Sequence, residues 1–78
     1  MPAAPPPDDL VLRQRQAVGD RIRLLRRERG LTQEQLAERS GLDRKTVSRA
    51  ENGRYSMPLD HLVMMARALG VHLADLAG

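Results

Sequence analysis

The fold of this chain is indicated most clearly by TQEQLAERSGLDRKTVSRAENG, residues 32–53. Apolar residues recur at helical spacing on both sides of Ser40 and Gly41. Glycine tolerates the left-handed backbone with which many helices end, so Gly41 marks the end of the first segment. The stretch therefore predicts two short helices joined by a tight turn.

Residues at the ends of both segments favour helix caps. Thr32 and Gln35 have the spacing of a capping box, in which each side chain reaches a backbone N–H of the other residue. Asp43 is a strong N-cap for the second helix, and Asn52 followed by Gly53 is a preferred helix ending. Two capped helices around a turn of about three or four residues are typical of a helix-turn-helix motif, whose second helix enters the major groove of DNA.

The composition limits the classes of function. A chain of 78 residues is one small domain, and its formal net charge of +3 is carried mainly by arginine, which grips phosphate and guanine in a bidentate manner. Cysteine is absent, which excludes disulfides and thiolate metal sites and suits a reducing cytoplasm. Phenylalanine and tryptophan are also absent, which argues against single-strand recognition by base stacking. No membrane span and no signal peptide is expected.

The remaining sequence predicts a tail and three further helices. Residues 1–7 (MPAAPPP) are expected to be an extended or disordered tail, and residues 8–78 the DNA-binding domain. A long helix is predicted over 9–29, one over 58–69 and a short one over 71–76. The fold class is thus an all-α bundle of five helices. The expected inner residues are Leu10, Val18, Ile22 and Leu25 in the long helix, and Leu59, Leu62, Val63, Ala66 and Leu69 in the next.

Three segments carry a resemblance to a known family. The runs GLTQEQLA (30–37), SGLD (40–43) and VSRAENG (47–53) resemble the Cro/C1-type regulators, which include phage repressors, Xre-like regulators and restriction–modification controller proteins. The resemblance implies a compact, lambda-repressor-like bundle that binds double-stranded DNA and regulates transcription. Met57 and Pro58 depart from the proline and serine that are common there, and His72 replaces a small polar cap.

The second helix of the motif, over 43–52, is the predicted reading helix. With Val47 placed inward, Lys45, Ser48 and Arg49 point outward, flanked by Thr46, while Arg44 stands at the first position of the helix, beside the wall of the groove. Arginine and lysine pair best with guanine edges. Some of these side chains could instead touch phosphate only. The predicted base readers are Arg44, Lys45 and Arg49, with Thr46 and Ser48 as adjuncts.

Phosphate contacts are expected at both ends of the motif. Thr32 and Gln33 open the first helix, where free N–H groups and the positive end of the helix dipole attract an anion. The family's equivalent glutamine implies the same role for Gln33. Tyr55 could instead be a packing residue at the rim, and Arg23 and Arg27 of the long helix are expected to be solvated. The loop that resembles the family's second phosphate clamp contains Asn52, Arg54, Tyr55 and Ser56.

Arg26 and Glu51 lie at the edges of the inner stripes of their helices. A charge in that position is costly unless it is paired, so the simplest expectation is that the two residues form an ion pair. A matching bridge in the family implies the same pairing. The alternative is two independent side chains that reach solvent separately.

Two classes of function compete with that of a DNA-binding regulator. Catalysis is not expected, because His61 and His72 have no nucleophile, metal-ligand or phosphate-loop pattern around them, and no cofactor, metal or small-molecule ligand is predicted. A protein-interaction module, such as an antitoxin or a bridging co-activator, would have little reason to keep basic side chains on one outward face. Steep salt dependence of DNA affinity would separate the two classes.

The sequence also predicts a homodimer. The segment 58–69 has more apolar residues than one buried stripe needs, and Met64 projects off that stripe as an adaptable contact. The rival interpretation is that Met64 is a single exposed apolar residue, which is common. The expected compartment is the cytoplasm of a bacterium or phage host, at the nucleoid. The predicted dimer contacts are Met64, Val71, Leu73 and Leu76.

Overall fold

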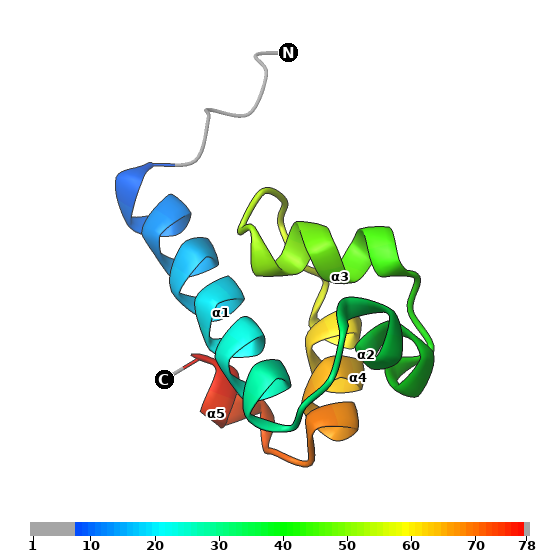
Figure 1. Ribbon diagram of the computed structural model, residues 1–78. Helices are drawn as coiled ribbons and strands as arrows, with labels where there is room; N and C mark the ends of the chain where they lie inside the picture. Colours follow the sequence, from blue (N-terminus) through cyan, green and yellow to red (C-terminus); the bar gives the residue numbers. More distant parts are fainter. Residues whose placement is uncertain (1–7, 78) are drawn as a thin grey trace.

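The computed structural model describes residues 8–77, and these form five helices with no strand among them (Figure 1). The all-α fold class is thereby confirmed, while the tail predicted over residues 1–7 lies outside the described residues. Within residues 8–77, no helix is both long and apolar enough to cross a membrane. The helices are α1 (Asp9–Glu28), α2 (Gln33–Ser40), α3 (Arg44–Glu51), α4 (Leu59–Leu69) and α5 (Leu73–Ala77).

The predicted caps of the central motif are confirmed. The Thr32 hydroxyl accepts the Gln35 N–H at 3.1 Å, and the Gln35 side-chain oxygen accepts the Thr32 N–H at 2.8 Å. Asp43 accepts the Thr46 N–H at 2.7 Å, and Gly41 closes α2 with a φ of +77°. These local hydrogen bonds satisfy the free donors of each helix start, which fixes where α2 and α3 begin.

The boundaries of the last two helices differ slightly from those predicted. Pro58 is the N-cap of α4 rather than its first residue, and it makes no side-chain cap bond. The last helix begins at Leu73 rather than Val71, because the Asp75 carboxylate accepts the His72 N–H at 2.9 Å. The later start of the last helix therefore follows from the cap formed by His72 and Asp75.

One apolar core joins the helices. α1 packs against α3, α4 and α5, and α2 packs against α3 and α4. Removal of these side chains from water supplies the main driving force for a domain of this size. The fully buried apolar side chains are Ile22, Leu36, Val47, Ala50 and Met65, with Leu69 and Leu76 2 % exposed.

The predicted inner stripe of α4 is wrong at two positions. Leu59 and Val63 are 62 % and 47 % exposed, whereas Met65 is fully buried. Apolar residues occur on almost every side of this helix, so periodicity alone admits more than one inner face. Packing against α2 on one side and α5 on the other selects the face that contains Met65, Ala66 and Leu69.

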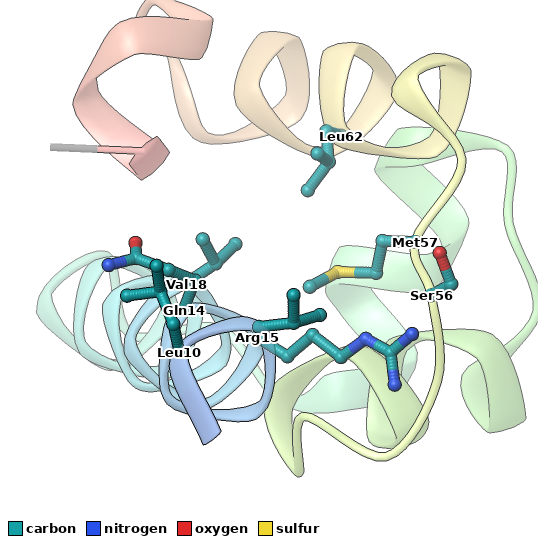
Figure 2. A pocket seen from close by; sticks show the side chains of 8 residues that line it. Leu10, Gln14, Arg15, Val18, Ser56, Met57 and Leu62 are labelled. Carbon is teal, nitrogen blue, oxygen red and sulfur yellow. The ribbon is translucent and has the colours of Figure 1, made fainter. Parts of the chain in front are cut away.

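Leu10 was also expected in the core, and the structure corrects this. The first turns of α1 project beyond the body of the bundle (Figure 1), which leaves Leu10 56 % exposed. There it forms one wall of an open, mainly apolar groove of about 400 Å³, with Val18, Met57 and Leu62 among the other lining residues (Figure 2).

Candidate nucleic-acid interface

Helix α3 has one buried face and one exposed, basic face. Val47 and Ala50 are fully buried, which fixes the rotation of the helix about its axis. The opposite side therefore faces solvent. Lys45 and Arg49 are exposed on that side, with Thr46 and Ser48 half-buried beside them, while Arg44 is exposed at the first residue of the helix.

Two glycines hold the end of α3 close to α1. A Cβ atom on Gly19 would lie 2.5 Å from the Ala50 carbonyl oxygen, so only glycine permits this backbone contact. Gly53, with a φ of +64°, follows the helix, and a Cβ there would lie 2.9 Å from the Gln16 Cα. The C-terminal end of α3 is therefore fixed by backbone packing as well as by its buried side chains.

Arg26 and Glu51 are brought together as a buried pair. Arg26 donates from Nε to Glu51 Oε2 at 2.6 Å and from Nη2 to Oε1 at 2.9 Å, while its Nη1 donates to the Leu31 carbonyl oxygen at 2.8 Å. Glu51 is fully buried and Arg26 is 8 % exposed. The pair thus joins α1, the loop before α2 and the end of α3.

Both members of this pair are charged. Burial alone raises the pKa of Glu51, but hydrogen bonds from Arg26 and Gln33 and the positive charge of Arg26 outweigh burial, so the net pKa lies below its ordinary value. The hydrogen bond to Glu51 raises the pKa of Arg26 despite its own burial. An ionised carboxylate accepts hydrogen bonds only, which suits the donors around it.

Arg23 belongs to the same network, which corrects the expectation that it is merely solvated. It donates from Nη2 to the Glu51 carbonyl oxygen at 3.4 Å and to Asn52 Oδ1 at 3.0 Å. Its Nε lies 3.5 Å from Glu51 Oε1. A cation at the C-terminal end of a helix interacts favourably with the helix dipole. Arg27, by contrast, is exposed as expected.

Two of the predicted phosphate contacts meet around Glu51. Gln33 donates from Nε2 to Glu51 Oε1 at 3.3 Å, and Asn52 is tied to the same carboxylate through Arg23. The start of α2 and the end of α3 are therefore fixed relative to each other by one buried anion. Thr32 is exposed beside Gln33, where its hydroxyl caps α2.

The loop after α3 is partly packed and partly exposed. Tyr55 is half-buried against the core, and its hydroxyl lies 3.4 Å from His61 Nδ1. Burial raises the pKa of Tyr55. Arg54 and Ser56 on either side are exposed. The ring of Tyr55 therefore packs against the core, as the alternative interpretation expects. The side chains of Arg54 and Ser56 remain accessible.

One of the four predicted dimer contacts is buried inside the bundle, and the other three are half-buried. Leu76 is 2 % exposed and belongs to the core, so its assignment to a dimer surface was wrong: α5 turns it inward against the bundle. Met64 is half-buried, and its Cε would lie 3.7 Å from a Cβ on Gly41. Val71 and Leu73 are half-buried near the start of α5.

The chain is similar to a family of helix-turn-helix proteins and to individual transcription regulators. Residues 22–76 match the helix-turn-helix family profile HTH_3. The chain is 52% identical over 56 residues to an HTH-type transcriptional regulator of Methanothermobacter thermautotrophicus, a match that covers 70% of this chain and 81% of that protein. It is 43% identical over 61 residues to the immunity repressor protein of Bacillus phage phi105.

The match to the phage repressor covers 78% of this chain but only 42% of that protein, so the chain spans less than half of its length. Among solved structures, the restriction–modification controller protein C.AhdI from Aeromonas hydrophila is similar, with a TM-score of 0.77 and 39% identity. That match covers 80% of this chain and 94% of the controller.

Proposed function

This chain belongs to the helix-turn-helix family and is a DNA-binding transcription regulator, and we propose that it recognises a specific duplex site by inserting α3 into the major groove. The observation that carries this proposal is the division of α3 into a fully buried face and a basic exposed face. A helix whose buried face fixes its position can present its outward side chains to base edges without a prior rearrangement of the backbone.

The proposed base readers lie on the outward face of α3, at its edges and at its first residue. Arg44, Lys45 and Arg49 supply donors that fit the O6 and N7 acceptors of guanine. Thr46 and Ser48 sit between them, half-buried, where a hydroxyl or methyl group can add a contact to a neighbouring base.

Phosphate contacts flank this face and position it. Arg23 occupies Oδ1 of Asn52, so the amide nitrogen of Asn52, with its two N–H donors, is the end left for a phosphate oxygen. Gln33 gives one of its two amide protons to Glu51 and keeps the other. The remaining proposed phosphate contacts are Thr32, Arg54, Tyr55 and Ser56.

The proposed active species is a homodimer. One helix-turn-helix unit reads only a few base pairs, and a two-fold symmetric pair would place half-sites about one helical turn apart, roughly 34–36 Å. Met64, Val71 and Leu73 remain the proposed contacts, without Leu76. The match to a phage immunity repressor supports repression as the outcome, and the proposed compartment is the bacterial cytoplasm, at the nucleoid.

Selection of bound duplexes from a random library, followed by affinity measurements over a range of salt, tests this function. We expect a symmetric site and an affinity that falls steeply with salt, because each neutralised phosphate releases counterions. A variant with Arg44, Lys45 and Arg49 all changed to glutamine should lose both site preference and affinity. The matched control changes Arg13, Arg27 and Arg39 to glutamine, which removes the same number of charges from exposed positions on α1 and α2.

Retention of sequence preference by the α3 variant would refute reading by α3. Failure of every duplex to bind above background, with a salt-insensitive residual affinity, would favour the protein-interaction module instead.

A further inference from the structure

The outward face of α4 combines exposed apolar side chains with two opposite charges. Leu59 and Val63 are 62 % and 47 % exposed, and Met64 beside them is half-buried. Asp60 and Arg67 are exposed on the same face, one near each end of the helix. Within residues 8–77, neither of these two charges takes part in an ion pair.

The spacing of the two charges is informative. Asp60 and Arg67 are two helical turns apart, roughly 10.5 Å along the axis, so they share a face but are too far apart to meet as i,i+4 pairs do. The midpoint between them falls between Val63 and Met64. A two-fold axis at this midpoint exchanges the acidic and the basic end of the face.

We infer that this face of α4 binds the same face of a second copy of the chain, with the two helices antiparallel. In this register Asp60 lies opposite Arg67 of the second copy, and the reciprocal pair forms at the other end. Val63 lies opposite Met64 of the second copy, at the centre. Apolar contacts at the centre and charged pairs at the rim are the usual arrangement of a protein interface.

A second copy fits this face better than an unrelated partner because the pattern is self-complementary. An isologous contact requires that residue i meets residue j and that j meets i, and two opposite charges placed symmetrically about the centre satisfy this with favourable pairs at both ends. The contact is small for a specific interface, so we expect a dimer that dissociates at micromolar concentrations and is reinforced on DNA.

This inference rests on the homodimer proposed above and assigns it a surface and a register. The test uses charge reversal in the full chain. In Asp60→Arg, and separately in Arg67→Asp, the two reciprocal pairs become like-charged, so each variant alone should dimerise about tenfold more weakly than the wild type by sedimentation. Both altered residues are exposed, so circular dichroism should show unchanged folding.

Mixing the two single variants is the decisive measurement. In the mixed pair one copy has arginine at both positions and the other has aspartate at both, so every contact is again between opposite charges. We expect a heterodimer with affinity close to that of the wild type. The double swap, Asp60→Arg with Arg67→Asp, should restore self-association. As a control, Glu38→Arg at an exposed position of α2 should leave dimerisation unchanged.

The outcomes separate this inference from the function on which it rests. A wild type that dimerises while the mixed variants do not would overturn the α4 register and leave the homodimer intact. A wild type that stays monomeric at high micromolar concentration and binds a single half-site would overturn both the register and the homodimer, but not DNA reading by α3.

Discussion

The buried carboxylate of Glu51 is held by the guanidinium of Arg26 through two hydrogen bonds of 2.6 and 2.9 Å. Arg23 and Gln33 donate to the same carboxylate from α1 and α2. The last residue of α3 is thereby fixed to both helices that support it. The stability of the domain and the placement of the reading helix depend on the same anion.

Removal of one member of this pair should be strongly destabilising. We expect Arg26→Met to lower the free energy of unfolding by about 3–5 kcal/mol, because Glu51 then remains buried without its main partner. Arg26→Met combined with Glu51→Leu should cost less than the sum of the two single changes. Denaturant unfolding of all four proteins measures this coupling, and strictly additive effects would show that the residues act independently.

Acid should weaken the domain through Glu51. Its pKa in the folded state lies below the unfolded value of about 4.3, so its contribution to stability is complete above that pH and is lost as the pH falls through the folded pKa. The difference in unfolding free energy between wild type and Glu51→Gln should therefore shrink between about pH 5 and pH 2. A difference that stays constant over this range would contradict the assignment.

Gly19→Ala should destabilise the domain, although alanine is the better helix former. At an exposed helical position the change would stabilise by about 1 kcal/mol. Here the new Cβ would lie 2.5 Å from the Ala50 carbonyl oxygen, so we expect a net loss of about 1–3 kcal/mol and a shifted α3. Ala17→Gly, on the exposed side of α1, is the control and should cost about 0.5–1 kcal/mol. Equal or greater stability of Gly19→Ala in thermal unfolding would refute the close contact.

Arg49→Ala should weaken binding to the selected site by about 1–3 kcal/mol and relax base preference at one position in each half-site. The exposed position of Arg49 predicts no loss of folding. Competition between the selected duplex and random DNA measures this effect. An equal loss on both duplexes would identify Arg49 as a phosphate contact.

Asn52→Asp distinguishes the role of the Asn52 side-chain oxygen, which accepts from Arg23, from that of its side-chain nitrogen, the proposed phosphate donor. The carboxylate still accepts from Arg23, so stability should be unchanged, but the phosphate-facing donors are replaced by a negative charge. We expect weaker binding to all duplexes and a salt slope reduced by about one.

Arg23→Met is the companion change, because it frees Asn52 to rotate. It should reduce affinity at temperatures at which the variant is fully folded. If the variant instead binds DNA as tightly as the wild type once the affinity is corrected for the fraction of folded protein, the role of Arg23 is structural alone.

Local sequence determined the elements of this protein. The capping box of Thr32 and Gln35, the cap at Asp43 and the left-handed Gly41 act over three or four residues, and so they were predictable. The pattern also predicted which side of α3 is buried, because a single short helix with Val47 and Ala50 admits one inner face. The roles of the residues on its outer face remain predictions.

Tertiary packing alone decided the rest. Arg23 meets Glu51 and Asn52 across 28 and 29 residues, and no periodicity encodes such a pairing. Met65 rather than Val63 enters the core. Because α4 is apolar on most sides, its sequence admits several inner faces, and packing against the neighbouring helices determines which face is buried. Capping energies depend on atoms within one turn of the chain, whereas long-range hydrogen bonds, and the rotation of a helix that is apolar on several sides, depend on which surfaces meet after the elements have formed.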